Sequence, residues 1–593
     1  MDTVMVLDFG GQYAHLIANR IRRLGVYAEV RDPASSVLEV RHAKGFILSG
    51  GPASVYGENA PAFNEQILGL GRPVLGICYG HQLLMHVLGG QVLQGKTHEF
   101  GVAELSIQSN PLFEGLRESE RVWMSHADSV QELPQGFKCI GSTRDCAGAA
   151  VHHPGKNFFG LQFHPEVTHT ENGMKILENF LRVCACKHEW GIPGYLDKKI
   201  QEIRVQVGGK KVFLLASGGV DSTVCLALLN RAVGSENVKA LHIDNGFMRA
   251  HESERVIEAL HQQGFSNFVH EDASGYFLEK THGLIDPEEK RKAIGNAFIE
   301  VQQRALSDLR LNGDEWVLGQ GTIYPDTIES GRTRHAKVIK THHNRVQAVQ
   351  ELIAQGKVIE PLDELYKDEV RALGLELGLP LNVVQRHPFP GPGLAVRVLC
   401  SNGQEPGVPR EVQDRVNALA MDKGFTAVIL PLKSVGVQGD NRTYQHVAVL
   451  KGKGSWKELE ALSTRITNEV REINRVAWLV KGIVTPRTVH ALLSKKRLGV
   501  ARNADALVGQ NLHAFALYDS VWQFPVVLAP LECGQGEAVI LRPVNSTEAM
   551  TARFAELPME FVEKVSTALM GLEGVGAVLY DVTHKPPGTI EWE

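Results

Sequence analysis

The sequence lacks the features that mark several classes of protein. None of its eight cysteines lies in a Cys-x-x-Cys pair, so neither a disulfide framework nor a structural zinc site is indicated. No apolar run reaches the roughly 20 residues of a membrane-spanning helix, and the start has no secretory signal. A net charge of −5 provides no basic surface for nucleic acid. We therefore expect a cytosolic protein that binds neither membrane nor nucleic acid.

The composition and the order of apolar segments predict an α/β protein of several domains. The hydrophobic share of 43% and the charged share of 22% are those of an ordinary globular chain, and 593 residues suffice for roughly three to five domains. Short apolar strands alternate with amphipathic helices through the first third of the chain. This alternation predicts a parallel sheet covered by helices.

A cysteine ends one of these strands in the stretch Gly76-Ile77-Cys78-Tyr79-Gly80, and a helical pattern follows. Glycines two residues before and two residues after a nucleophile allow the strand to turn sharply and expose the side chain. The alternative is a buried structural cysteine. The local pattern favours a thiol nucleophile at Cys78.

A thiol nucleophile needs a base, a group that orients the base, and donors for the oxyanion. Downstream, the segment His164-Pro165-Glu166 offers an imidazole and a carboxylate two residues apart. The N–H groups of Gly51 and Tyr79 are our candidates for the oxyanion hole. A core histidine is the alternative for His164, and the combination of motifs makes it the weaker interpretation.

A second strand leads into a glycine turn and a helix at residues 217–222. Backbone N–H groups at such a turn form a site for phosphate. The Gly-Lys-Ser/Thr of a Walker A loop is absent, and an ordinary small-residue turn is the alternative. The predicted ATP-binding residues are Ser217, Gly218, Gly219, Val220, Asp221 and Ser222, with Asp221 as the ligand of Mg²⁺.

The N-terminal third and the loop at 217–222 each resemble a known family. Residues 1–187 resemble the class I glutamine amidotransferases in Ser49-Gly50-Gly51-Pro52, the Cys78 elbow and the His164 segment. That resemblance implies hydrolysis of glutamine through a thioester on Cys78, with release of ammonia. The loop at 217–222 resembles the N-type ATP pyrophosphatases, which implies transfer of AMP to an oxygen and release of pyrophosphate.

After the amidotransferase motifs, the chain carries in order the segments SGGVDS, GQGTIYPDTIES, IKTHHN, RHPFPGPGLAVR and KPPGTIEWE. This order resembles the GMP synthetase family, in its long, eukaryote-like form. The resemblance implies that ATP adenylates xanthosine monophosphate (XMP), that ammonia then displaces AMP, and that no organic cofactor is tightly bound. It implies domains at 1–187, 188–398 and 399–593, the first two with amidotransferase and Rossmann-like parallel sheets and the third α+β. It also implies a lid with Lys340 and an XMP site formed by Pro390, Gly391, Pro392, Arg442, Gln535, Lys585 and Glu591.

The last third contains an internal repeat of strand, helix and strand, at about 430–482 and 535–593. A second copy of a module can cover in one chain a sheet that would otherwise pair with a second molecule. We therefore expect a monomer, with a homodimer as the alternative. An unrelated insertion at 450–535 is the other interpretation of this region.

Three other functions are compatible with parts of the sequence. An NAD synthetase or a tRNA-thiolating enzyme would share the ATP loop, but would lack the segments RHPFPGPGLAVR and KPPGTIEWE that are present here. A scaffold protein on an inactive enzyme fold would predict eroded motifs, whereas Cys78, His164, Glu166, Asp221 and Lys340 are all present.

Overall fold

The computed structural model describes residues 1–11, 13–262, 264–265, 267–308, 315–329, 357–404, 407–438, 441–546 and 552–593. The chain forms two compact units. Unit 1 comprises Met1–Val205, Gly321–Ala354 and Glu360–Glu376, and unit 2 comprises Gln206–Gln320, Gln355–Ile359 and Leu377–Glu593. Helix α5 (Ile192–Val207) leads from the first to the second along the sequence. No helix of the described residues has the length and apolar character needed to cross a bilayer.

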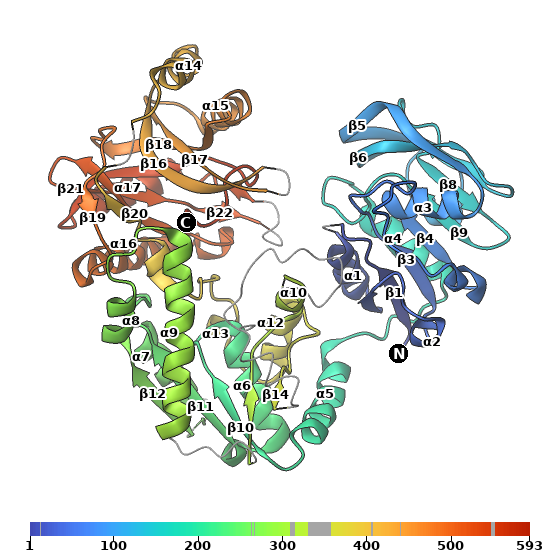
Figure 1. Cartoon of the computed structure of the whole chain (residues 1–593), viewed down its shortest axis with the longest axis horizontal. Coiled ribbons are helices and arrows are strands. Elements are labelled where there is room, and N and C mark those ends of the chain that lie inside the picture. Colours follow the sequence, from blue (N-terminus) through green and yellow to red (C-terminus); the bar gives the residue numbers. More distant parts are fainter. Residues whose placement is uncertain are drawn as a thin grey trace. The chain divides into compact units, whose positions relative to one another are not determined.

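Unit 1 is built on a nine-stranded sheet with the order β2-β1-β3-β4-β9-β8-β7-β5-β6 (Figure 1). The strands from β2 to β9 in this order are parallel, and the remaining pairs are antiparallel. The strands are β1 Thr3–Leu7, β2 Tyr27–Arg31, β3 Gly45–Leu48, β4 Val74–Ile77, β5 Gln91–Ile107, β6 Ser119–Glu132, β7 Lys138–Ser142, β8 Ala150–His153 and β9 Phe158–Leu161.

Helices cover both faces of this sheet because its central strands are apolar on both sides. In β1, Val4 and Val6 join a core cluster with α1 (Ala14–Arg23) and α4 (Gly173–Val183), whereas Met5 and Leu7 join the cluster on the opposite face. That second cluster contains residues of α2 (Val37–Val40) and α3 (Tyr79–Val87).

Residues far along the sequence return to unit 1 and pack against α1. They include the short helix α10 (Tyr324–Glu329) and helix α12 (Lys367–Glu376). The Tyr366 hydroxyl donates to the His15 carbonyl at 2.8 Å, and Arg22 forms a buried ion pair with Glu369 at 3.1 Å.

The first sheet of unit 2 is parallel, with the order β12-β11-β10-β13-β14. Its strands are β10 Lys211–Leu215, β11 Val238–Asp244, β12 Phe268–Asp272, β13 Trp316–Gly319 and β14 Val358–Ile359. Its helices are α6 Val220–Val233, α7 Glu252–Gln262, α8 Ser274–Lys280, α9 Pro287–Asp308 and α13 Leu381–Val384.

The second sheet of unit 2 is formed by two copies of the same series of elements, namely helix, strand, strand, helix and strand. Its order is β16-β17-β18-β24-β21-β20, and the antiparallel pair β18–β24 joins the two halves. Within each half an antiparallel hairpin is followed by a helix and a parallel strand. The first half is α14 Arg410–Met421, β16 Thr426–Gln438, β17 Asn441–Lys451, α15 Trp456–Glu469 and β18 Ile473–Gly482; the second is α16 Lys495–Ala514, β20 Val526–Cys533, β21 Gly536–Leu541, α17 Met559–Met570 and β24 Val575–Asp581. Two short ladders pair β15 Ser401–Asn402 with β19 His490–Ala491, and β22 Val544–Asn545 with β23 Arg553–Phe554.

A buried charge cluster ties the last residues of the chain to this sheet. Asp581 is fully buried and accepts hydrogen bonds from Arg475 at 2.9 Å, Arg542 at 3.2 Å and the Trp592 indole at 2.9 Å. Burial lowers the pKa of Arg475 to about 10, although the Asp581 carboxylate acts in the opposite direction. Because both guanidinium groups are buried, they depend on Asp581 for compensation of their charge.

Replacement of Asp581 by alanine should therefore destabilise the protein by about 3–5 kcal/mol, since two buried cations lose their carboxylate. The urea concentration at the midpoint of unfolding, followed by fluorescence, measures the effect. The matched control Glu563→Ala removes a carboxylate whose partner is the exposed Lys481, and should cost less than about 1 kcal/mol. Equal effects of the two substitutions would contradict the importance of the buried cluster.

Candidate functional sites: a thiol centre and a phosphate loop

Cys78 stands at the sharp turn between β4 and α3, as the glycine pattern predicts. Its backbone has the positive φ of 51°, which is uncommon for a residue with a side chain. The turn is held by hydrogen bonds from the Cys78 N–H to the Leu161 carbonyl at 2.7 Å and from the Gly80 N–H to the Ser49 carbonyl at 3.0 Å. A Cβ atom at Gly80 would collide with the Leu48 carbonyl, so only glycine fits there.

The structure brings His164 and Glu166 to this cysteine. His164 Nδ1 and Glu166 Oε1 are 2.6 Å apart, and both residues are buried. A Cβ atom added to Gly50 would lie 3.2 Å from His164 Cε1 and 3.8 Å from Cys78 Cβ, so that glycine lies against both side chains. Burial by itself lowers the pKa of His164, but Glu166 and Cys78 outweigh it, and the pKa lies well above its usual value.

The two candidate oxyanion donors lie next to each other. An added Cβ at Gly51 would be 3.2 Å from Tyr79 Cγ. Tyr79 is the first residue of α3, so its N–H has no acceptor within the helix. The loop that carries Gly51 begins at Ser49, and it is fixed there because the Phe9 N–H donates to Ser49 Oγ at 3.1 Å.

Contacts from α1 and the residue before it support the thiol centre, and no motif in the sequence indicates them. The ring of Tyr13 packs edge-on against His164, with centroids 5.2 Å apart. Arg20 Nε donates to the Glu166 carbonyl at 3.1 Å. These residues stand more than 140 positions from the histidine segment, and only the fold brings them together.

The predicted phosphate loop follows β10 in unit 2 and leads into α6. Ser217 Oγ and Ser222 Oγ are 3.1 Å apart, and the Gly219 N–H points to Ser217 Oγ at 3.3 Å. Gly218 has a φ of +77°, which a residue with a side chain rarely adopts, and a Cβ there would lie 2.5 Å from Val256 Cγ2. Asp221 lies in the first turn of α6.

This loop contains oxygen ligands that suit Mg²⁺. Asp221 supplies a carboxylate in the first turn of α6, and Ser217 and Ser222 supply two neighbouring hydroxyls. Carboxylate and hydroxyl oxygens are the donors that Mg²⁺ accepts together with phosphate. These residues therefore fit a magnesium–nucleotide complex. The described residues contain no group of three His, Cys, Asp or Glu side chains arranged to hold a metal ion.

The proline turn at Pro390-Gly391-Pro392 lies against the segment that follows β11. The Leu394 N–H donates to the Phe247 carbonyl at 2.7 Å, and the Gly393 N–H donates to the Pro390 carbonyl at 2.8 Å. Since the segment follows a strand beside β10, the turn lies near the carboxyl edge of the sheet that carries the phosphate loop.

Glu591 connects the C-terminal tail with the proline turn. Its carboxylate accepts two hydrogen bonds from Arg397, at 2.8 and 3.1 Å. Gln523 Nε2 donates to the Pro388 carbonyl at 3.0 Å and lies 3.3 Å from Glu591 Oε1. The family resemblance places Gln535 in the XMP site. In the structure Gln535 is exposed on the turn between β20 and β21, and Gln523 is the glutamine that contacts Glu591.

The remaining predicted residues lie beside the tail or outside the described part of the chain. The Val437 N–H donates to the Pro587 carbonyl at 2.8 Å, which holds the segment next to Lys585 against β16. Arg442 lies in β17, directly opposite Val437. Lys340 lies outside the described residues.

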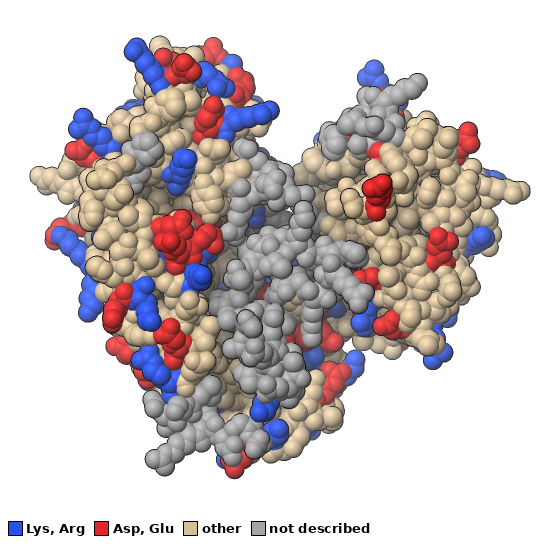
Figure 2. All heavy atoms as spheres, viewed as in Figure 1, with Lys and Arg blue, Asp and Glu red and all other residues tan. Residues whose placement is uncertain are grey.

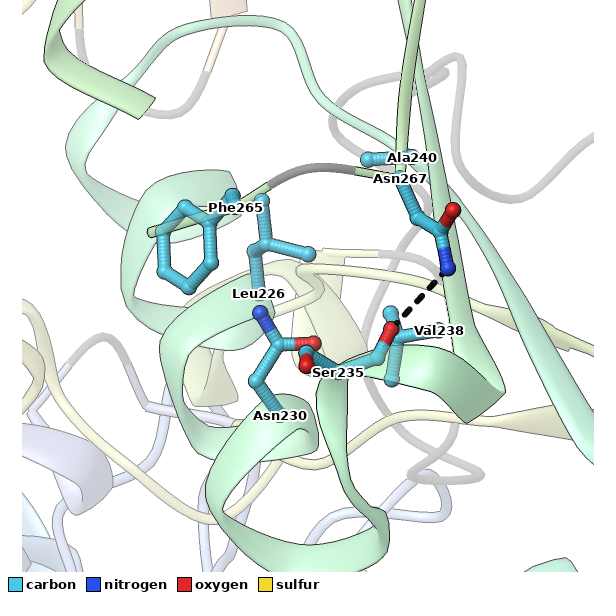
Figure 3. Close-up of a pocket in the computed structure, with 7 residues that line it drawn as sticks. All are labelled: Leu226, Asn230, Ser235, Val238, Ala240, Phe265 and Asn267. Atoms are coloured by element: carbon cyan, nitrogen blue, oxygen red, sulfur yellow. Dashed lines mark hydrogen bonds between the residues drawn. The ribbon is translucent and has the colours of Figure 1, made fainter. Parts of the chain in front are cut away.

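Two other surface features do not belong to these sites. One is a cavity of about 10 Å³, and Figure 3 draws the residues that line it. Among them, Asn267 Nδ2 donates to the Ser235 carbonyl at 3.2 Å. Because Val238 begins β11, this cavity lies at the amino edge of the sheet, opposite the phosphate loop. On the face shown in Figure 2, acidic and basic side chains of the described residues are interspersed.

Two family models match parts of the chain. The family Glutamine amidotransferase class-I matches residues 5–184, and the family GMP synthase C terminal domain matches residues 418–484 and 510–592. A crystal structure of a glutamine amidotransferase from Thermotoga maritima is 22% identical and covers 32% of this chain and 99% of its own, with a TM-score of 0.27.

Relatives of full length are also found. A probable glutamine-hydrolyzing GMP synthase of Leptospira interrogans is 45% identical over 600 residues, with 100% of this chain and 99% of its own length covered. The glutamine-hydrolyzing GMP synthase of Heliobacterium modesticaldum is 39% identical over 606 residues, with the same coverage. That of Caldicellulosiruptor saccharolyticus is 44% identical over 502 residues, which make up 80% of this chain and 97% of its own.

The relatives from Leptospira and Heliobacterium match the whole chain, so the long form is not confined to eukaryotes. Identity at this level over the whole length shows the family, and the range matched by the amidotransferase family, residues 5–184, contains the positions of Cys78 and His164. The chain belongs to the glutamine-hydrolyzing GMP synthases, the enzymes of glutamine-dependent GMP synthesis.

Proposed function

We propose that unit 1 releases ammonia from glutamine at Cys78, with His164 as the proton carrier and Glu166 as the group that orients it. The observation that carries this assignment is the buried contact of 2.6 Å between His164 and Glu166, beside a cysteine on a constrained turn. The raised pKa of His164 favours an imidazolium that pairs with the thiolate.

In this mechanism the thiolate attacks the amide carbon of glutamine. The N–H groups of Gly51 and Tyr79 stabilise the oxyanion that forms. His164 donates its proton to the leaving nitrogen, and ammonia departs as the thioester forms. The neutral imidazole then takes a proton from water, which hydrolyses the thioester to glutamate.

In unit 2, the loop from Ser217 to Ser222 binds the phosphates of ATP, and Asp221 holds the Mg²⁺ that accompanies them. The hydroxyl groups, the glycine at positive φ and the N-terminus of α6 support this role. The family resemblance also implies a role for Lys340, which lies outside the described residues. Adenylation of XMP releases pyrophosphate, and ammonia displaces AMP to give GMP.

The XMP site lies between the proline turn and the C-terminal tail. Pro390, Gly391 and Pro392 contact the base, and Lys585 binds the phosphate. The resemblance gives Arg442 the same role, and its side chain lies outside the described part of the structure. The contacts of Glu591 with Arg397 and Gln523 support its place at this site. Gln535 remains the weakest member of the set, since it is exposed on a hairpin turn.

We assign the chain to a monomer in the cytosol. The two repeated halves of the C-terminal sheet are joined by the pair β18–β24 within one chain. This arrangement supports the monomer, because the second half takes the place that a second molecule would occupy in a dimer. The eight cysteines are free thiols, which supports a reducing compartment.

Cys78→Ala should abolish GMP formation from glutamine and leave GMP formation from added ammonia intact, because only the first reaction uses the thiol. GMP production from XMP and MgATP with each nitrogen source measures both. Cys139→Ala, which removes another thiol of unit 1, should keep both activities. Loss of the ammonia-dependent reaction in Cys78→Ala would contradict the separation of the sites.

Glu166→Gln should shift the alkaline limb of the glutaminase pH profile to lower pH and reduce kcat by roughly 10²-fold. Glu166 raises the pKa of His164, so its neutralisation lowers that pKa, and the imidazolium is lost at a lower pH. Glutamate release as a function of pH measures the shift. Glu171→Gln removes an exposed carboxylate nearby and should leave the profile unchanged; an unshifted limb in Glu166→Gln would refute the ion pair.

Sedimentation of the purified chain should give one species of about 65 kDa at micromolar concentration, the mass of one chain. Addition of XMP and MgATP should not change this mass. A stable species of twice that mass would overturn the monomer and show that the repeated sheet still pairs between molecules.

A further inference from the structure

The phosphate loop is supported by side chains at the start of α7, which lie outside the predicted ATP-binding residues 217–222. Glu252 and Ser253 of this turn each act through one intermediary side chain, and Val256 of the next turn lies directly against Gly218. We propose that His242, fixed by Ser253, is a positioning residue that sets the conformation of the phosphate loop. This inference rests on the proposed role of residues 217–222 in binding ATP.

His242 is fully buried in β11 and makes two hydrogen bonds with its ring. Nδ1 lies 2.8 Å from the carbonyl of Ala216, the residue directly before the loop, and Nε2 lies 3.0 Å from Ser253 Oγ. A carbonyl only accepts, so Nδ1 must carry the proton and donate it. Nε2 is then the acceptor, and the Ser253 hydroxyl donates to it.

This arrangement requires a neutral imidazole. Burial, as the largest cause, and the neighbouring His270 lower the pKa of His242, whereas its bond to Ala216 and the carboxylates of Asp244 and Glu252 act in the opposite direction. The Ala216 N–H also donates to the Leu241 carbonyl at 2.8 Å, so β11 holds both polar groups of this residue's backbone. The strand and the ring together fix the point from which the loop departs.

Two other residues of α7, Glu252 and Val256, constrain the loop at Gly218. Glu252 accepts a hydrogen bond from Arg386, and Arg386 Nη1 donates to the Gly218 carbonyl at 2.9 Å. One turn along α7, Val256 occupies the space that a side chain at Gly218 would need. The first turn of α7 therefore constrains Ala216 and Gly218, on both sides of Ser217, and the loop meets ATP already shaped.

The function of His242 follows from this geometry. A loop that binds phosphate through backbone N–H groups works only when those groups converge on one point. If the Ala216 carbonyl loses its donor, the start of the loop can rotate and the N–H groups diverge. The consequence is weaker binding of MgATP, with no direct effect on XMP or on the glutaminase.

The test measures release of pyrophosphate with saturating ammonia, so that glutamine hydrolysis is not required. His242→Phe keeps an aromatic ring of similar size and removes both hydrogen bonds. It should raise the KM for MgATP by roughly five- to tenfold, the change expected when one hydrogen bond is lost, and leave the KM for XMP unchanged. His242→Asn keeps an N–H donor near the position of Nδ1 and should recover most of the wild-type KM.

Two further variants control for stability and for the ring itself. His270→Phe changes the exposed histidine whose ring stacks on His242, with centroids 5.8 Å apart, and should leave the KM for MgATP unaltered. Ser253→Ala removes the outer hydrogen bond and should raise the KM for MgATP by about two- to threefold, which keeps the test informative where His242→Phe does not fold.

The outcomes separate this inference from the proposed ATP site. A folded His242→Phe, judged by circular dichroism and thermal unfolding, with the wild-type KM for MgATP would overturn the positioning role. An equal loss in His242→Phe and His242→Asn would also overturn it, since the retained donor would then have no effect. Normal pyrophosphate release in Asp221→Ala would instead refute the assignment of the loop, whatever the result at His242.

Discussion

At the carboxyl end of a parallel strand the backbone leaves the sheet, and its next amide groups lose their partners in the ladder. Both candidate sites lie at such an end. In unit 1, β4 ends at Ile77 and α3 begins at Tyr79, with Cys78 between them; in unit 2, β10 ends at Leu215 and α6 begins at Val220. The first N–H groups of each helix have no acceptor within the helix. One constraint on parallel sheets therefore underlies both the proposed oxyanion site in unit 1 and the proposed phosphate site in unit 2.

The two turns differ in what the chemistry requires of them. A nucleophile must project a side chain, so Cys78 itself adopts the positive φ and glycines provide room around it. A phosphate site must present backbone, so the positive φ falls on Gly218. In both cases a second element fixes the turn from outside: Ser49 accepts the Gly80 N–H in unit 1, and α7 acts through His242 in unit 2. The supporting contacts are as necessary as the turn, because a mobile turn would not keep its donors convergent.

The sequence predicted the parts of each site that lie within a few residues of one another. Cys78 with its glycines, His164 with Glu166, and the loop 217–222 are local patterns, and the structure places them as expected at the ends of strands. It could not predict contacts that depend on the path of the chain. Tyr366 reaches His15 across 351 positions, and Arg386 reaches Gly218 across 168. Gln523 was missed for the same reason, since no motif near it indicates that β20 begins beside the tail.

The repeated C-terminal sheet explains why the buried cluster around Asp581 is asymmetric. Two identical molecules that pair through equivalent strands must present the same residues twice. Here β18 contributes Arg475 and β24 contributes Asp581, and these residues meet in one buried cluster that also receives Trp592 of the tail. Only the second half continues into the C-terminal tail. The pair β18–β24 therefore carries a single buried charge cluster, and it anchors a single chain end. When one chain forms both halves of the sheet, the sequences of the two halves can diverge. The second half then carries the tail, and the first half supplies Arg475 of the cluster. A symmetric interface between identical copies does not allow this difference.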